Sequence, residues 1–152
     1  MTGPSVEIDG VEQVQKNLAK LAKKFSQATV DGAVAGAHLI RTDAVKSIQD
    51  ESGGEIVTRT RAGGGEYEHT ASKEGDAPNT DTGRLVQSVQ VDVKPTGIFV
   101  GSSLDYAGWL EDGTRKMAAR PWLVPAMERN TDAVQKLIGS RIKDVVIKHG
   151  DV

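Results

Sequence analysis

The sequence predicts an α+β protein, in which two N-terminal helices and a long C-terminal helix pack with a small antiparallel sheet. Apolar residues recur every three or four positions over 11–50 and again over 121–148, which is the period of one helix face. Between these segments, Val89, Val91 and Val93 alternate with polar residues, the period of a half-buried strand. The sheet is expected to hold a hairpin over about 86–102 and one or two short strands. The whole chain, 1–152, has the length of a single domain.

Two helices are expected before residue 51. The first has an apolar stripe and lysines on its other sides; the stripe is Val11, Val14, Leu18, Leu21 and Phe25. The second runs from about Gln27 to Asp50 and is rich in alanine, which has the best helix propensity and suits close approach to another helix. Ahead of both, residues 5–8 predict a short strand or an extended lead-in.

Residues 51–80 differ in composition from the rest of the chain. They hold six acidic residues against three basic ones, two glycine clusters and few apolar side chains. Loops of this length inside a compact domain are usually functional or disordered. We therefore expect a long flexible loop within the domain, in which only 55–60, E-I-V-T-R-T, alternates enough to predict a strand.

Regular structure is expected to return at Asp81-Thr82-Gly83. Asp81 or Thr82 can cap a helical turn over 84–88, and Pro95-Thr96-Gly97 turns the chain between the two strands of the hairpin. The triplet D-T-G is also that of aspartic proteases, in which two facing aspartates share a proton. The chain holds one copy without an apolar strand before it, so the capping turn is the favoured interpretation, although a homodimer could supply a second aspartate.

Both tryptophans lie within residues 100–126. Residues 104–110 predict a short apolar helix that Asp105 caps and Gly113 ends, because glycine takes the positive φ that closes a helix. Pro121 suits the first turn of the last helix, which is expected to run to about Lys148.

Composition limits the classes of function. The net charge of −2 is unlike the strong basic excess of a general nucleic-acid binder, and the absence of cysteine rules out disulfides and thiolate zinc sites. No apolar run is long enough to span a membrane, and the first residues lack the features of a signal peptide, so we expect a protein made in the cytoplasm.

Catalytic and metal-binding motifs are weak. Asp105, Glu111 and Asp112 could bind Mg²⁺ or Ca²⁺ if their oxygens converged, or they could cap helices and pair with Arg115 or Arg120. There is no cysteine nucleophile and no G-x-S-x-G motif. We therefore expect neither an enzyme nor a bound cofactor.

Four short motifs in series resemble the tail-completion family of long-tailed bacteriophages, which includes minor tail and head–tail joining proteins. They are T-G-R-L-V-Q-S-V at 82–89, V-G at 100–101, D-Y-A-G-W-L-E-D-G-T at 105–114 and R-P-W-L-V-P-A-M at 120–127. The lead-in V-E-I-D-G-V at 6–11 also fits the family. The resemblance covers most of the chain and is weakest over 51–79.

The resemblance implies an α+β structural protein of the virion neck or tail end. Such proteins form rings, commonly six-fold, that complete the tail tube and join it to the filled capsid. The implied partners are other copies of this chain, the tail tube protein and head connector or stopper proteins, with assembly in the host cytoplasm. The motif or interface residues are Thr82, Gly83, Leu85, Tyr106, Ala107, Trp109, Glu111, Gly113, Thr114, Arg120, Pro121, Trp122 and Pro125.

The acidic loop suggests how DNA would pass through such a ring. Carboxylates that face the channel repel phosphates and let the genome slide; the candidates are Glu55, Glu66, Glu68 and Glu74. Two alternatives remain open: a non-catalytic adaptor between cellular proteins, and a hydrolase built on Asp81.

Overall fold

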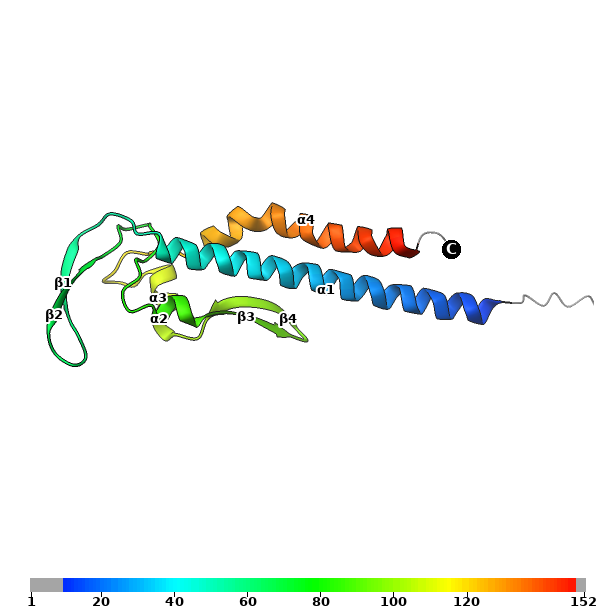
Figure 1. Ribbon diagram of the computed structural model, residues 1–152, viewed down its shortest axis with the longest axis horizontal. Coiled ribbons are helices and arrows are strands. Elements are labelled where there is room, and N and C mark those ends of the chain that lie inside the picture. The colour runs from blue at the N-terminus through cyan, green and yellow to red at the C-terminus, as the bar shows by residue number, and fades with distance from the viewer. Residues whose placement is uncertain (1–9, 150–152) are drawn as a thin grey trace, which may run out of the picture.

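The structure is a computed structural model that describes residues 10–149 (Figure 1). The strand or lead-in expected over 5–8 lies outside the described residues. The fold is α+β, as the sequence predicts. In chain order its elements are α1 (Val11–Gln49), β1 (Ile56–Thr60), β2 (Glu66–Thr70), α2 (Arg84–Ser88), β3 (Val89–Lys94), β4 (Gly97–Ser102), α3 (Asp105–Asp112) and α4 (Val124–His149).

The prediction of two N-terminal helices is wrong, because α1 is one uninterrupted helix of 39 residues. No glycine or proline separates Phe25 from Gln27, so nothing ends the helix there. The Thr29 hydroxyl donates to the Phe25 carbonyl four residues earlier, and this bond spans the expected break within regular helix. At about 1.5 Å per residue, α1 is about 58 Å long and forms the axis of the molecule.

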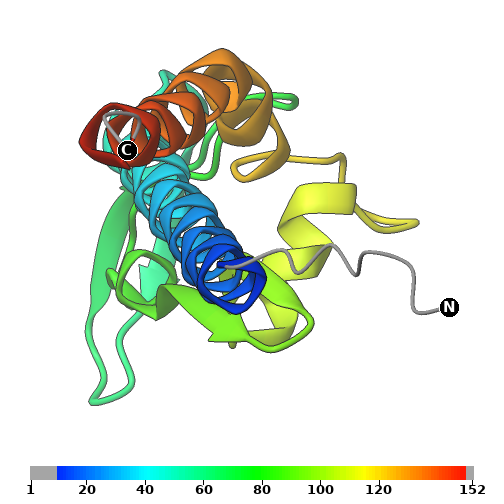
Figure 2. The same ribbon diagram turned by 90° about the vertical axis from the view of Figure 1, so that its right-hand side faces the viewer.

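Helix α4 runs antiparallel to α1, and the β3–β4 hairpin lies on another side of α1 (Figures 1 and 2). The two helices approach closely where α1 has glycines. A Cβ atom on Gly32 would lie 2.7 Å from the Cα of Ile138, and one on Gly36 would lie 2.7 Å from a methyl carbon of Val134. The small residues of α1 therefore serve helix packing, as the alanine-rich stripe predicts.

The strands form two separate two-stranded antiparallel sheets rather than the single small sheet expected. In the predicted hairpin, β3 pairs with β4 so that Val91 lies opposite Val100, while 86–88 belong to α2. The segment expected to be a loop holds the β1–β2 hairpin, in which Thr58 lies opposite Glu68. The strand predicted over 55–60 is confirmed as β1, and its partner β2 was not predicted.

The buried core lies where the end of α1, α2, β3, α3 and the start of α4 meet. It consists of Ala44, Ile48, Leu85, Val89, Ala107, Trp122 and Ala126. The Arg41 side chain adds a polar tie across this region, since its Nε donates to the Val89 carbonyl at 2.7 Å. Elsewhere α1 is covered less, and its first turns are exposed.

Helix ends differ from the expected ones in two places. Gly83, with φ 75°, is the N-cap of α2 and no side chain caps it, so the capping role expected for Asp81 or Thr82 is wrong. Asp105 is the first residue of α3 rather than its cap, and its charge there suits the helix dipole. Gly113 ends α3 with φ 75°, as predicted.

None of the helices in the described part of the chain is both long and apolar enough to cross a bilayer.

Candidate functional site

The third and fourth motifs meet where α3 lies against the start of α4. The carboxylate of Glu111, at the end of α3, accepts the backbone N–H groups of Trp122, Leu123 and Val124, each at 2.9 Å. The first N–H groups of a helix have no partner within it, so Glu111 caps α4 from a distant point in the sequence. These three bonds hold the chain as it enters α4, which begins at Val124 rather than at Pro121 as the sequence predicts.

Trp122 fixes the same junction from inside the core. Its side chain is 3% exposed, and its indole N–H donates to the Ala107 carbonyl of α3 at 3.3 Å. Gly113 lets the chain return after α3, because a Cβ there would lie 2.8 Å from the Ala119 nitrogen and its φ of 75° suits glycine. The following loop is closed by two backbone hydrogen bonds between Thr114 and Met117.

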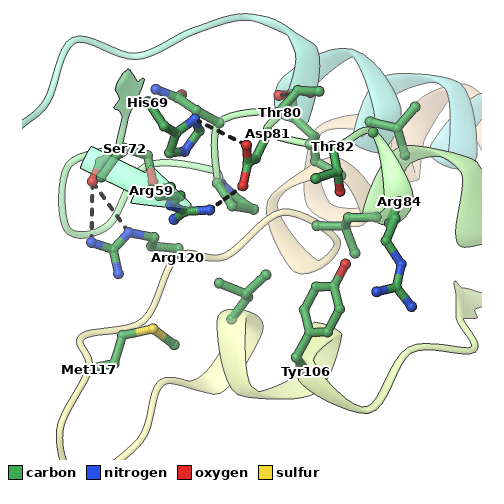
Figure 3. A pocket seen from close by; sticks show the side chains of 18 residues that line it. Arg59, His69, Ser72, Thr80, Asp81, Thr82, Arg84, Tyr106, Met117 and Arg120 are labelled. Atoms are coloured by element: carbon green, nitrogen blue, oxygen red, sulfur yellow. Dashed lines mark hydrogen bonds and ion pairs between the residues drawn. The ribbon is translucent and has the colours of Figure 1, made fainter. Parts of the chain in front are cut away.

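A pocket of about 450 Å³ lies beside this junction (Figure 3). The first motif also reaches this pocket, through Thr82 and Gly83 before α2 and Leu85 within it. Tyr106 points into it from α3 toward Thr82, and Arg120 closes another side by donating to the Ser72 carbonyl at 3.3 Å. The buried Ser72 hydroxyl has no protein partner, which leaves one donor for a water or ligand group to satisfy.

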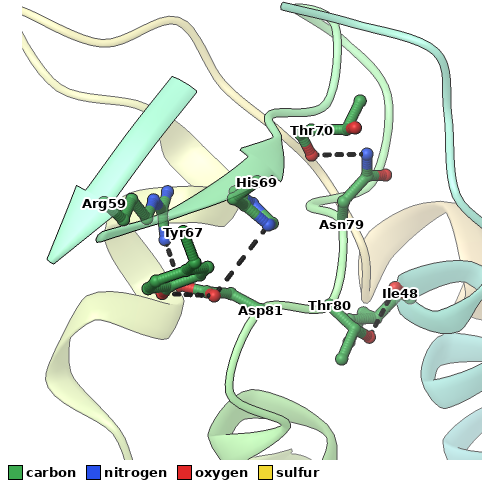
Figure 4. A network of polar contacts seen from close by, with 8 residues as sticks. All are labelled: Ile48, Arg59, Tyr67, His69, Thr70, Asn79, Thr80 and Asp81. Atoms are coloured by element: carbon green, nitrogen blue, oxygen red, sulfur yellow. Dashed lines mark hydrogen bonds and ion pairs between the residues drawn. The ribbon is translucent and has the colours of Figure 1, made fainter. Parts of the chain in front are cut away.

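A polar network beside the pocket holds the β1–β2 hairpin through Asp81 (Figure 4). The Asp81 carboxylate accepts the Tyr67 hydroxyl at 2.7 Å, forms an ion pair with Arg59, and lies 3.9 Å from Nδ1 of His69. Arg59 belongs to β1, and Tyr67 and His69 belong to β2, so the carboxylate of Asp81 contacts both strands on the same face of the hairpin. Asn79 supports the same strand by donating to the Thr70 carbonyl at 2.8 Å.

This arrangement shifts two pKa values. Burial raises the pKa of Asp81, but hydrogen bonds from Tyr67 and Arg59 and the nearby positive charges outweigh burial, so the net pKa is lowered. The hydrogen bond to Asp81 is also the main reason why the pKa of Tyr67 is raised, since it favours the protonated phenol. The network therefore favours the ionised form of Asp81.

We expect Asp81→Asn to loosen the hairpin and to remove a pH dependence. Because its pKa is depressed in the folded state, the contribution of Asp81 is present above the ordinary value of 3.8 and is lost as pH falls through the lower folded value. The partners are partly exposed, so the loss of unfolding free energy should stay within about 1 kcal/mol. Amide hydrogen exchange over 56–70, measured at pH 7 and pH 3, checks this result.

Asp76→Asn is the matched control for that experiment, because Asp76 is exposed and its carboxylate is outside the network. It should leave exchange in the hairpin unchanged at both pH values. Equal protection of the hairpin in wild type and Asp81→Asn would contradict the role given to Asp81.

The pocket gives little support to aspartic-protease chemistry. Asp81 is the single acidic residue among the described residues that line it, and the shared-proton mechanism needs two. No group of three or more His, Cys, Asp or Glu side chains within residues 10–149 is arranged to hold a metal ion. Asp105, Glu111 and Asp112 do not form such a group, and Glu111 is engaged with the start of α4.

The structure brings some expected site residues together and separates others. Thr82, Gly83, Leu85, Tyr106 and Arg120 line the pocket. Structural positions around it are taken by Ala107, Glu111, Gly113, Thr114, Pro121, Trp122 and Pro125, of which Pro125 lies in the first turn of α4. Trp109 is 59% exposed and faces away from the core. The acidic residues Glu55, Glu66, Glu68 and Glu74 are exposed and lie outside the pocket.

Sequence reasoning missed the residues that dock the hairpin. Tyr67 and His69 alternate with acidic residues in E-Y-E-H-T, a period-two pattern that predicts a strand with one inward face. That signal was available in the segment interpreted as a loop. The pairing of Arg59 with Asp81 had no sequence signal, because it depends on how the hairpin folds back.

Comparisons of the chain with family models, curated proteins and solved structures found no match. The resemblance to tail-completion proteins therefore depends on the four motifs and their order.

Proposed function

We propose that this protein is a structural subunit of a phage neck or tail end, which completes the tail tube and helps to join the tail to the capsid. The observation that carries the proposal is the series of four motifs in the order found in tail-completion proteins. The subunit acts without catalysis or a cofactor, in a ring that is six-fold on the tail. Its partners are other copies of itself, the tail tube protein and connector or stopper proteins, and its place is the virion.

The positions of the motif residues support this proposal. Most of them build the junction of α3 with α4 through backbone contacts and burial, which suits a family signature that specifies a fold. Trp109 differs, because it extends its side chain from the same junction into solvent. Exposed tryptophan is among the residue types that contribute most to binding at protein interfaces.

We expect the purified protein to form closed rings, alone or on purified tail tubes. Light scattering over a range of protein concentrations gives the subunit number, and negative-stain images of the same fractions show whether the particles have a central hole. A protein that stays monomeric and also ignores tail tubes would contradict the proposal and favour the adaptor.

Trp109→Ala tests, within the same experiment, whether the exposed surface around Trp109 takes part in ring formation. It should weaken ring formation without lowering the melting temperature, because its side chain contributes little to the core. Phe99→Ala is the matched control, since Phe99 is 49% exposed on β4 and outside the motif segments. Equal effects of the two variants would show that the motif surface has no special part in assembly.

A further inference from the structure

The two ends of the elongated molecule carry opposite charge. The first turns of α1, residues 11–27, hold four lysines and one glutamate, whereas the segment with the β1–β2 hairpin, residues 51–80, holds six acidic residues and three basic ones. Figure 1 shows the start of α1 at one end of the long axis and the β1–β2 hairpin at the other. The two charged regions therefore cannot meet within one subunit.

The start of α1 is a helix without cover, here called the basic arm (residues 11–24). Every residue from 11 to 20 is exposed, including Val14 at 58% and Leu18 at 60%. Among the described residues, Lys16 is paired with Glu12 of the preceding turn, at 3.7 Å, and neither Lys20 nor Lys23 forms an ion pair. The exposed side chains of Val14, Leu18, Lys20 and Lys23 are therefore available to a partner.

The β1–β2 hairpin presents the complementary surface, here called the acidic face. Cross-strand partners share a face, so Ile56, Thr58 and Thr60 lie on the same side as Glu66, Glu68 and Thr70. The opposite side holds Arg59, Tyr67 and His69, which contact Asp81. Glu66 and Glu68 have no cationic partner among the described residues, and Ile56, the first residue of β1, is 63% exposed.

We propose that the basic arm of one subunit binds the acidic face of a second copy of this chain, head to tail. Two basic arms repel each other, and so do two acidic faces, so a symmetric contact through either surface is disfavoured. A head-to-tail contact uses a different patch on each side of the subunit, which is what a closed ring needs. The inference rests on the proposed function and names the surfaces that would join its subunits.

The helix wheel gives the arm a side suited to this contact. At 3.6 residues per turn, Ala19 and Ala22 lie between Leu18 on one flank and Lys16 and Lys23 on the other. The small alanines let the flat hairpin approach, Leu18 can cover Ile56, and the flexible lysine stems reach the carboxylates of the acidic face. These acidic residues then serve subunit contact rather than the passage of DNA.

Charge reversal tests the contact with two variants. The first is Lys20→Glu/Lys23→Glu in the arm, and the second is Glu66→Lys/Glu68→Lys in the hairpin. Each variant alone should need at least a tenfold higher protein concentration to assemble than wild type, because both of its ends then carry the same sign. The matched control is Glu128→Lys/Asp132→Lys on exposed positions of α4, which should assemble like wild type.

An equimolar mixture of the two variants gives the decisive result. Each acidic arm then meets a basic hairpin and each basic arm meets an acidic hairpin, so assembly should return to near the wild-type concentration as an alternating particle. Failure of the mixture to recover, or wild-type assembly by either variant alone, overturns the inference. If either result occurs while wild type still forms rings, the proposed function survives and the acidic face is free to line the channel.

Cross-linking places the contact directly, because the chain has no cysteine of its own. Lys23→Cys and Glu68→Cys proteins, mixed under oxidising conditions with tail tubes present, should give a disulfide-linked heterodimer. Lys136→Cys replaces Lys23→Cys in the control pair. Cross-linking at equal yield in both pairs, or none in the first pair, counts against the head-to-tail contact. A wild-type protein that never associates, with or without tubes, removes both this inference and the proposed function.

Discussion

Replacement of Gly32 by leucine is expected to destabilise the protein by about 3 kcal/mol, the upper part of the range for overpacked sites. The Cβ of any side chain at this position would lie 2.7 Å from the Cα and 3.2 Å from the nitrogen of Ile138. Backbone atoms cannot rotate away as a side chain does, so α1 and α4 must separate. Urea denaturation followed by far-UV circular dichroism measures the loss.

A graded series separates this packing effect from helix propensity. At Gly36 the nearest atoms are methyl carbons of Val134, which can move, so Gly36→Ala should cost less than Gly32→Ala. At Gly139 a Cβ would meet nothing within 4 Å, so Gly139→Ala should stabilise the protein by about 0.5–1 kcal/mol through propensity alone. The same chemical change is thus expected to have opposite signs on the two helices. A stabilising Gly32→Ala would show that the helices do not cross there.

The packing of α4 on α1 also shows how far sequence reasoning reaches. The stripes of three-and-four spacing predicted helical structure over the residues of α1 and α4, and the alternation of Val89, Val91 and Val93 predicted β3, because each pattern depends on local geometry alone. The break near Phe25 was predicted wrongly, since a change in the composition of the stripe was interpreted as the end of a helix. A helix ends where backbone hydrogen bonds find other partners, and none is available at that point.

The candidate site was predicted as a set of residues but not as a set of contacts. Trp109 and Trp122 were both expected as motif or interface residues, and the structure assigns Trp122 to the core and leaves Trp109 exposed. Helix capping was one of the interpretations left open for Glu111, but which helix it caps was not predicted, and neither was the role of Asp81, because each depends on groups at least eleven residues away that only the folded chain brings near. Periodicity carries no information on such pairs.

Glu111→Gln is expected to lower the free energy of unfolding by about 2–3 kcal/mol, because hydrogen bonds to a charged group contribute about 1.5–3 kcal/mol. Both carboxylate oxygens accept backbone N–H groups at the start of α4. Glutamine keeps one acceptor and turns an NH₂ group toward the other donors, while the negative charge that favours a helix N-terminus is lost. Glu111→Asp keeps the charge but is one methylene too short, so it should also destabilise.

Glu128→Gln is the control, because Glu128 is exposed on α4 just beyond its first turn and should change stability by no more than about 0.5 kcal/mol. Thermal melts and tryptophan emission measure the effect, since Trp122 becomes more exposed to water as the start of α4 loosens. Wild-type stability in Glu111→Gln would mean that water satisfies these N–H groups equally well.

The Glu111 variant also distinguishes residues that build the subunit from residues that join subunits. Glu111 belongs to the third motif and the N–H groups that it accepts belong to the fourth, so the bond links two motifs within one chain. Any assembly defect of Glu111→Gln should therefore follow its fraction of unfolded protein and disappear at low temperature. The defect of Trp109→Ala should persist at every temperature at which the subunit is folded, because that side chain contributes to the surface and not to the core.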